Sequence, residues 1–424
     1  MQKKNMLMKP WKWTAAVLFV STLSLAQQLD KKIYAESIKA YEAKDYQTFL
    51  SLNKLLDSLR PFHPTYLYNL AAAHTLNDNR EEALLTLRKL VLMNNTIAFE
   101  ADEDFKSIRD DGGFQAVTDL KKSQAKVIET SKQVVTLSEK GLHPEGLYYL
   151  PKSKKWLATS IRKGKIVSFD IKTGECTDWL KEEKMLSVMA LKPDANEEYL
   201  WVATAAFKEL ENFDKTTEGK SEVLKVNIKT RKIEARYSVK GSHTFGDLIV
   251  AKNGAVYVSD SYAPIIYKVD KNGISIFNKL ADGFNLQGLA LNKEESKLFV
   301  ADYLKGIAVI DIAKNAKIWL DFPDGSSAKG IDGLVFYNNS LVAVQNGVKP
   351  IRITRFQLNQ EQNEITGFKV LDNNRADFIE PALAIISDGK LYFFGNSDWS
   401  AYDQNGVLDT TNANNPILFS CKLN

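Results

Sequence analysis

Apolar residues follow two different spacings along this chain of 424 residues. Between residues 29 and 124 they recur at helical intervals, which predicts helices over about residues 33–41, 46–59, 66–76 and 81–92. Polar or proline-containing breaks at Asp45, at Pro61 with Pro64, and at residues 77–79 separate these segments. Short connections between helices of this length favour antiparallel pairs. After residue 133 the apolar residues instead form the short runs that are typical of β-strands.

A unit of two apolar strands recurs six times after residue 141. Each copy has an aliphatic anchor near the start of its first strand, and its second strand ends on a small polar residue 12 to 15 positions later. The anchors are Leu147, Met189, Leu248, Leu289, Leu334 and Leu383, and they lie 42, 59, 41, 45 and 49 residues apart. A repeat of about 40–50 residues built from short strands is typical of a β-propeller blade. The sequence therefore predicts a multidomain protein, with a helical domain at residues 27–125 followed by a six-bladed β-propeller at residues 126–424.

The sixth copy lacks one strand. Apolar runs near residues 383–386, 391–395 and 416–423 supply three strands before the chain ends. Propellers commonly close their ring by taking the missing strand from the other terminus, which removes the open sheet edges. We expect residues 133–138 to be this closing strand.

The helical segments also carry a recognisable pattern. Residues 68–74 (Tyr-Asn-Leu-Ala-Ala-Ala-His) and 82–88 (Glu-Ala-Leu-Leu-Thr-Leu-Arg) resemble a short tetratricopeptide repeat. Such modules bind extended peptides or pack against a neighbouring domain. Both roles stay open, and the first implies a protein or peptide partner.

The first 26 residues read as a secretory signal. They contain Lys3, Lys4, Lys9 and Lys12 and no acidic residue. Residues 14–25 form an apolar stretch too short for a relaxed membrane span, and a small-x-small cleavage site ends at Ala26. This pattern predicts export to a periplasmic or extracellular location, with no integral membrane domain after cleavage. An uncleaved N-terminal anchor is the alternative.

Charge narrows the range of partners. The whole chain has 56 basic and 52 acidic residues, and removing the four lysines of the signal leaves 52 against 52. A neutral protein without a basic face is not expected to bind nucleic acid or an anionic membrane. The two cysteines, Cys176 and Cys421, are either bridged across the first and sixth blades or remain two separate thiols.

The start of each first strand should face one common mouth of the propeller channel, where a small-molecule ligand is expected. Two carboxylates and an amide among these residues suit a hard divalent cation such as calcium, although a hydrogen-bond network would also satisfy buried acids. Asp247 and Glu380 are immediate neighbours of this ring. The ring itself consists of Glu145, Ser187, Gly246, Gln287, Asp332 and Pro381.

The motifs around this ring resemble those of the senescence marker protein and gluconolactonase family, and more distantly those of paraoxonase and strictosidine synthase. The hexapeptide at residues 142–147 (Leu-His-Pro-Glu-Gly-Leu) resembles the family's Glu-Gly motif, and residues 331–334 (Ile-Asp-Gly-Leu) its Pro-Asp-Gly motif. Residues 245–247 (Phe-Gly-Asp) and 287–289 (Gln-Gly-Leu) resemble the motifs in which the family ligand is Asn, which here is replaced by Gly246 and Gln287. The resemblance implies a metal site formed by Glu145, Asp332, Gln287 and Asp247.

The same resemblance implies hydrolysis of a lactone or ester at the mouth. A cation would polarise the carbonyl group, and Asp332, His143 or His243 would activate water. The alternative for both histidines is an ordinary loop position. Residues that follow the second strands are candidate substrate contacts, although an acid such as Asp302 can equally brace its own turn. These candidate contacts are Arg162, Tyr262, Asp302, Tyr303, Asn346 and Trp399.

Several enzyme classes are disfavoured. The chain has no Gly-rich phosphate loop, no Gly-x-Ser-x-Gly elbow, no Cys-x-x-Cys pair and no His-Glu-x-x-His helix. Two functions of different classes remain as predictions: a cation-assisted hydrolase of the lactonase type, and a non-catalytic propeller that binds a ligand or partner.

Overall fold

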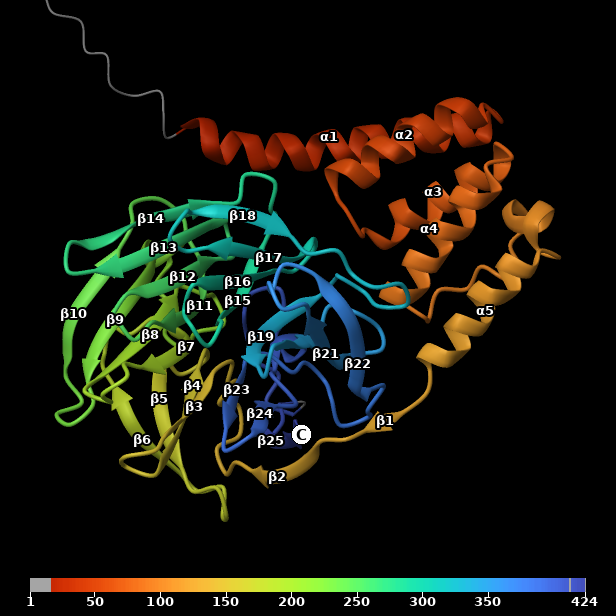
Figure 1. Ribbon diagram of the computed structural model, residues 1–424. Helices are drawn as coiled ribbons and strands as arrows, with labels where there is room; N and C mark the ends of the chain where they lie inside the picture. Colours follow the sequence, from red (N-terminus) through yellow and green to blue (C-terminus); the bar gives the residue numbers. More distant parts are fainter. Residues whose placement is uncertain (1–16, 412, 424) are drawn as a thin grey trace, which may run out of the picture. The chain divides into compact units, whose positions relative to one another are not determined.

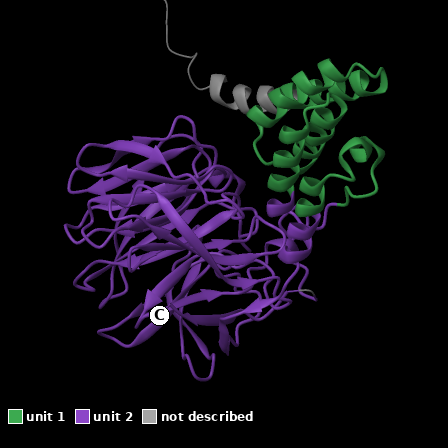
Figure 2. Cartoon of the chain, turned by 45° about the vertical axis from the view of Figure 1, so that its right-hand side comes forward, with its two compact units in different colours: residues 1–90, 98–117 green, residues 91–97, 118–424 purple. Residues whose placement is uncertain are grey.

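The computed structural model describes residues 17–411 and 413–423, and the side chains of residues 17–28 are not described. The chain forms two compact units (Figure 2). One comprises residues 1–90 with 98–117, and the other comprises residues 91–97 with 118–424. The fold class is the predicted one, with helices followed by a six-bladed β-propeller.

The helices begin and end at residues that disfavour continuation. Asp45 caps the second helix by accepting a 3.1 Å hydrogen bond from Thr48 N–H, and Pro64 occupies the first turn of the third. Phe49, Leu70 and Ala73 pack in the core between them. The helices are α1 (Val17–Glu42), α2 (Tyr46–Leu59), α3 (Pro64–Leu76), α4 (Arg80–Met93), η1 (Glu103–Ile108) and α5 (Gly112–Gln124). The likeness to tetratricopeptide repeats stays a prediction.

The predicted secretory signal falls largely outside the described residues. Residues 1–16 lie outside them, and residues 17–26 belong to the first turns of α1. Among the described residues, no helix combines the length and apolar character needed to cross a membrane.

Six small antiparallel sheets form the propeller (Figure 1). Blade one contains β3 (Leu147–Leu150), β4 (Lys155–Ser160), β5 (Lys165–Phe169) and β6 (Cys176–Lys181). Blade two contains β7 (Ser187–Pro193), β8 (Tyr199–Ala205), β9 (Ser221–Asn227) and β10 (Ile233–Ser238), and blade three contains β11 (Phe245–Val250), β12 (Val256–Asp260), β13 (Ile265–Asp270) and β14 (Gly273–Lys279).

The other three blades follow the same order. Blade four contains β15 (Leu286–Leu291), β16 (Lys297–Asp302), β17 (Gly306–Asp311) and β18 (Ala316–Trp319). Blade five contains β19 (Ile331–Tyr337), β20 (Ser340–Gln345), β21 (Arg352–Leu358) and β22 (Ile365–Asn373). Blade six contains β23 (Ala384–Ser387), β24 (Lys390–Phe394) and β25 (Ile417–Lys422).

The ring is closed around its axis by the first strands. These contact one another in the order β3, β7, β11, β15, β19 and β23, and β23 returns to β3. The apolar core lies in the seams between neighbouring blades. One cluster joins Val167 of blade one to Phe394 of blade six, and another joins Val342 of blade five to Phe393 of blade six. Each blade thus buries its faces mainly against its neighbours, so the ring must be complete to cover every face.

Two strands from before the first blade join the propeller, and one of them closes the ring. β2 (Lys132–Thr136) pairs antiparallel with β25 and forms the outer strand of blade six, at the position where residues 133–138 were expected. Val135 and Leu137 are buried in the seam between blades six and one. The preceding β1 (Ile128–Glu129) is an additional fifth strand on β22 of blade five, which the sequence pattern did not predict.

The polar segment before β2 is fixed to blade five. Asn373 Nδ2 donates hydrogen bonds to Gln124 O and Lys126 O at 2.8 and 2.7 Å. The buried carboxylate of Asp372 accepts hydrogen bonds from the backbone and the hydroxyl of Ser131 at 3.0 and 2.5 Å. This segment is therefore part of the propeller and not a free linker.

The two cysteines are free thiols, with Cys176 partly buried and Cys421 buried. Burial raises the pKa of both thiols, that of Cys421 to about 11. Of the two possibilities left open by the sequence, a disulfide or two separate thiols, the structure has the second.

Candidate functional site

One end of the propeller channel is formed by the beginnings of the first strands, and we call it the acidic mouth. A cavity of about 370 Å³ opens there. All six blades contribute to its lining. The lining residues are Glu145, Met189, Phe207, Thr244, Ser261, Tyr262, Asn285, Gln287, Tyr303, Asp332, Asn346, Glu380 and Trp399.

Small residues let the first strands approach closely below this mouth. A Cβ atom on Gly146 would lie 2.8 Å from Met189 O, and one on Gly333 would lie 2.5 Å from Ala382 O. On Gly288, a Cβ atom would lie 2.6 Å from Asp332 O. Each glycine therefore faces the backbone of the next blade, which explains the small residue in the sequence repeat.

Three carboxyl groups converge in the acidic mouth: those of Glu145, Asp332 and Glu380. Burial raises the pKa of Glu145 well above its usual value, and the charges of Asp332 and Glu380 raise it further. Burial likewise raises the pKa of Asp332 to about 6 and that of Glu380 to about 7, with repulsion from Asp332 adding to the effect on Glu380. No lysine, arginine or histidine is among the described residues that line the cavity. The mouth therefore holds three acids with raised pKa values, of which Asp332 and Glu380 titrate at about pH 6 and 7.

Glu145 is oriented by residues that follow the second strand of blade six. Its Oε1 accepts a hydrogen bond from the indole N–H of Trp399 and a 3.3 Å hydrogen bond from Ser397 Oγ. His143 lies behind it, with Nε2 3.8 Å from the same oxygen. The His143 ring is fully buried and its Nδ1 is 2.9 Å from Tyr402 Oη. Burial lowers the pKa of His143 to about 3, so the ring is neutral. His143 thus positions the wall of the site and does not reach the cavity.

Asp332 is held by a chain of polar groups. Asn346 Nδ2 donates a 2.5 Å hydrogen bond to Asp332 Oδ2 and another to Pro381 O at 3.0 Å. The hydroxyl of Tyr303 donates to Asn346 Oδ1 at 3.0 Å. The second carboxyl oxygen, Asp332 Oδ1, has no hydrogen-bond partner within the described chain. Asp332 therefore presents one fixed and one available oxygen to the cavity.

Gly246 and Gln287, the two ring positions where the sequence motifs suggested Asn as a ligand, take part in a packed polar wall. A Cβ atom on Gly246 would lie 2.6 Å from Ser261 Oγ and 3.4 Å from Gln287 Oε1, so the side chains of Ser261 and Gln287 already fill this space. Gln287 Nε2 donates to Asn285 Oδ1 at 2.5 Å, and Gln287 Oε1 accepts from Ser261 Oγ at 3.4 Å. These side chains form a local amide network at the wall.

Asp247, a predicted metal ligand, lies in the channel wall and not among the residues that line the mouth. Its Oδ1 accepts from Leu248 N–H at 2.8 Å, and its Oδ2 accepts from Leu289 N–H at 2.9 Å. Burial raises the pKa of this carboxyl. Both oxygens are thus occupied, Oδ1 within β11 of blade three and Oδ2 by the first strand of blade four.

Three other predicted site residues lie away from the cavity. His243 Nδ1 is 2.7 Å from Asp260 Oδ2, and Asp260 raises the pKa of this histidine. Arg162 forms a 2.6 Å ion pair with Glu211. Asp302 is fully buried and accepts hydrogen bonds from four backbone N–H groups, those of Phe284, Asn285, Leu304 and Lys305. These residues were expected to face the mouth, but each side chain is held by another partner: His243 by Asp260, Arg162 by Glu211, and Asp302 by backbone N–H groups.

The remaining predicted contacts do line the cavity. Tyr262, which is 44% exposed, Tyr303, Asn346 and Trp399 surround the three acids. Phe207 and Asn285 are additional lining residues that the sequence did not single out. Asn285 immediately precedes β15 and lies two positions before Gln287. Its position at the entry of a first strand could therefore have identified it as a lining residue.

Two loops meet over blade one beside the mouth. The polar insertion of blade two, residues 206–220 between β8 and β9, contains Phe207, whose ring lies edge-on to Trp399 with centroids 5.4 Å apart. Lys208 Nζ donates to Gln404 O at 2.6 Å, and Gly406 lies against the backbone of Lys208. The long polar insertion of blade two is therefore packed against the blade-six loop and contributes one wall of the site.

Metal binding is not evident from a preformed cluster. Among the described residues, no group of three or more His, Cys, Asp or Glu side chains has an arrangement that would hold a metal ion. The available donors are the free carboxyl oxygens of Glu145, Asp332 and Glu380. Their mutual repulsion is the feature that fits a hard cation, because a cation would relieve it.

No protein-family model matches the chain, and no curated protein is similar to it. Solved structures with a similar fold include the aldose sugar dehydrogenase of Streptomyces coelicolor, with 14% identity and a TM-score of 0.47 over 70% of this chain and 99% of that one. A gluconolactonase of Xanthomonas campestris has 13% identity and a TM-score of 0.46 over 70% of this chain and 92% of that one. Virginiamycin B lyase of Staphylococcus aureus has 16% identity and a TM-score of 0.44 over 66% of this chain and 87% of that one. The blades themselves, and not these distant similarities, define the fold of this chain.

Proposed function

We propose that the acidic mouth binds a small lactone or ester and hydrolyses it. The observation that supports this proposal is the convergence of Glu145, Asp332 and Glu380, all with raised pKa values and those of Asp332 and Glu380 at about 6 and 7, around a 370 Å³ cavity. General acid–base catalysis is most effective when the pKa of the catalytic group is near the operating pH.

Asp332 is assigned the role of the base. Its Oδ1 would take a proton from water while the water oxygen bonds to the acyl carbon, and Asn346 would keep the carboxyl oriented through Oδ2. The acyl C–O bond then breaks, and Glu380 in its protonated form would donate a proton to the departing alkoxide. The product of a lactone would be the open hydroxy acid.

A divalent cation, with calcium as the first candidate, fits Glu145 and Asp332 as its two carboxylate ligands. When bound, such a cation supplies Lewis-acid polarisation of the carbonyl group and offsets the repulsion between the acids. Gly246 and Gln287 leave the donor set smaller than in the related family, and Asp247 is occupied by backbone N–H groups.

The competing proposal is a non-catalytic ligand-binding propeller. It is favoured by the same amide network, in which Gln287 and Asn285 bind each other, and by the aromatic wall of Tyr262, Tyr303 and Trp399. Amides and aromatic rings around a cavity recognise polar cyclic ligands without any reaction.

Purified full-length protein should first be analysed for bound metal and titrated with calcium, zinc and manganese while its melting temperature is followed. Binding to the folded state alone must raise the melting temperature. A panel of lactones and esters should then be assayed with the wild type, Asp332→Asn, Glu145→Gln and the exposed control Asp388→Asn. Hydrolysis should be lost in the first two variants, and kcat/KM of the wild type should rise as the pH increases through about 6.

The results separate the two functions. If a compound raises the melting temperature without being hydrolysed, and Asp332→Asn weakens that effect, the protein is a non-catalytic ligand-binding propeller. If no panel compound is hydrolysed or bound and both variants match the wild type, the acids are structural and both proposals fail.

Export and a protein or peptide partner for the helical unit also stay proposals. Cell fractionation with and without residues 1–26 tests the first. Pull-down with residues 27–125 deleted tests the second, provided that the remaining propeller keeps its melting temperature.

A further inference from the structure

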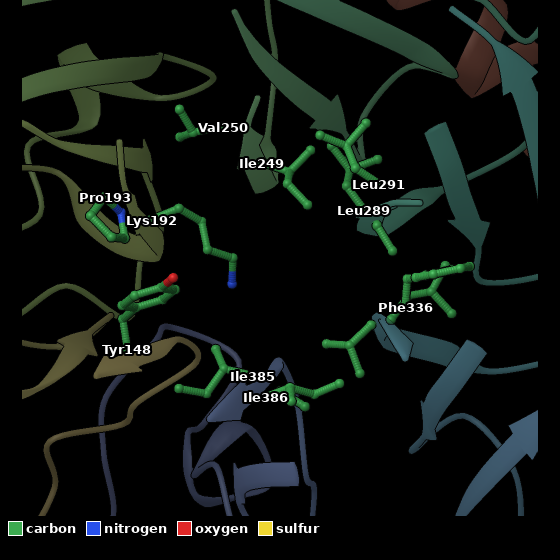
Figure 3. A pocket seen from close by; sticks show the side chains of 14 residues that line it. Tyr148, Lys192, Pro193, Ile249, Val250, Leu289, Leu291, Phe336, Ile385 and Ile386 are labelled. Atoms are coloured by element: carbon green, nitrogen blue, oxygen red, sulfur yellow. The ribbon is translucent and has the colours of Figure 1, made fainter. Parts of the chain in front are cut away.

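The other end of the channel has a different chemistry. Here the first strands end, and a second cavity of about 240 Å³ opens among residues of all six blades, which we call the apolar mouth. Its walls include Ile249, Leu291, Phe336 and Ile385 (Figure 3). This end is lined mainly by aliphatic and aromatic side chains, in contrast to the three acids at the opposite end.

One cationic side chain, that of Lys192 on β7, enters this apolar space. Figure 3 shows its amine directed toward the centre of the cavity, with Tyr148 beside it. The Nζ atom is 5.9 Å from the centroid of the Tyr148 ring. Within the described chain, Nζ has no hydrogen bond and no ion pair. Burial lowers the pKa of this amine, and the charge of Asp247 opposes that effect.

Asp247 does not neutralise the lysine by contact. Both of its oxygens are bound to the backbone N–H groups of Leu248 and Leu289, and no ion pair joins it to Lys192 within 4.0 Å. The only other ionisable group in the lining is the Tyr148 hydroxyl. The cavity therefore combines a partly exposed amine, unpaired within the described chain, with a wall of mainly aliphatic side chains, so an anion that enters it would gain an ion pair with Lys192 Nζ.

We propose that the apolar mouth binds a monocarboxylate with an unbranched aliphatic chain, its carboxylate paired with Lys192 Nζ and its chain against Ile249, Leu291 and Ile385. A single amine provides one point charge, which matches one carboxylate better than a doubly charged phosphate group. The aliphatic side chains of the wall would contact the hydrocarbon part of the ligand. This site is separate from the acidic mouth and does not rest on the lactonase proposal.

Calorimetric titration of the full-length protein with butanoate, hexanoate and octanoate tests the site. Each added methylene should tighten Kd by about fourfold until the cavity is filled. Lys192→Met keeps an unbranched apolar side chain and should weaken octanoate binding about tenfold or more, while Lys192→Arg should retain most of it. The matched control is Lys225→Met, because Lys225 Nζ also lies over an aromatic ring in blade two, 3.6 Å from the centroid of Tyr199, but does not line the cavity.

A second variant keeps the proposal testable if Lys192→Met does not fold. Leu291→Trp fills the cavity while the amine stays, and it should also abolish octanoate binding. Equal octanoate binding by the wild type, Lys192→Met and Leu291→Trp would overturn the proposal, as would no binding of any of the three acids at millimolar concentration. Trapping of octanal on Lys192 by borohydride, without carboxylate binding, would also overturn it, since the amine would then act as a nucleophile.

Discussion

At the scale of single residues, the acidic mouth is governed by charges that are buried near one another. Asn346 orients Asp332, and Trp399 with Ser397 orients Glu145. Glu380 has no such donor, and burial and Asp332 together raise its pKa to about 7. Ionisation of Glu380 therefore lowers the free energy of unfolding, whereas the protonated form does not.

Glu380→Gln should make the propeller less sensitive to pH. Because the folded pKa of about 7 exceeds the ordinary value of 4.5, the folded state binds the proton more tightly. The stability that the carboxyl contributes is present below about pH 4.5 and is lost as the pH rises through about 7. Between pH 4.5 and 8, the free energy of unfolding of the variant should therefore fall by about 3 kcal/mol less than that of the wild type. Urea unfolding at both pH values measures this, with the exposed Glu183→Gln as control, and an unchanged difference would refute it.

Gly333→Ala should destabilise the ring, because the new methyl group would lie 2.5 Å from Ala382 O of the next blade. A rigid backbone oxygen cannot move aside as a side chain does, so we expect a loss of about 1–3 kcal/mol in urea unfolding. Gly367→Ala is the matched control, since its nearest neighbour outside the adjacent residues is the flexible Gln357 side chain at 3.5 Å. Equal stabilities of the two variants would show that the first strands tolerate a wider ring.

At the scale of elements, the segment between the helices and the propeller behaves as part of blade five. β1 adds a fifth strand to β22, and Asp372 binds Ser131 through both of its carboxylate oxygens. Arg375 reinforces this contact by donating to Ser131 O at 2.6 Å and to Asp372 Oδ1 at 3.2 Å. Such contacts set the direction in which the chain enters β2.

Asp372→Ala should release this segment. It removes the acceptor of Ser131 and leaves Arg375 with the exposed Asp377 as its one remaining ion-pair partner among the described residues, so a loss of about 3 kcal/mol is expected. Asp377→Ala, which removes the 41% exposed partner of the same arginine, should cost less than about 1 kcal/mol. Urea unfolding and limited proteolysis near residue 126 measure the two variants. Cleavage at equal rates would argue that Asp372 does not hold the segment.

At the scale of the whole molecule, closure of the ring decides both stability and function. Blade six has only three strands of its own, and β2 supplies the fourth. The seam between blades six and one contains Val135 of β2 together with Leu147 and Phe394. Since the first strands form one continuous circle, opening this seam would also separate Glu145 of blade one from Asp332 of blade five.

Val135→Asp should open the seam and expose the edge of β25. A carboxylate in place of a 7% exposed valine costs about 3 kcal/mol or more, and an unpaired strand edge promotes aggregation. Thr136→Asp places the same charge at the neighbouring exposed position and should leave the protein monomeric. Size-exclusion chromatography and thermal unfolding distinguish them, and a stable monomeric Val135→Asp protein would show that β2 is dispensable.

The sequence by itself determined the helical segments and the number of blades. Helical spacing before residue 124 and six strand repeats after residue 141 report local burial patterns, which are properties of neighbouring residues and so are readable along the chain. The repeat also identified Glu145, Asp332 and Gln287 as strand entries that converge on one mouth, because each blade presents the same strand to the axis. The glycines at the same position of several repeats also indicate that the first strands pack closely against the backbone of the next blade.

Only the tertiary structure decided which of the equivalent positions meet. Asp302 has the same place in its blade as Asn346, yet four backbone N–H groups hold it in its turn while Asn346 reaches Asp332. The amine of Lys192 faces an apolar cavity because of residues from five other blades, none of which is near it in sequence. Such relations arise when the ring closes and brings distant segments together. The period of the repeat predicts the strands of each blade, but it does not predict which side chains of different blades lie next to one another.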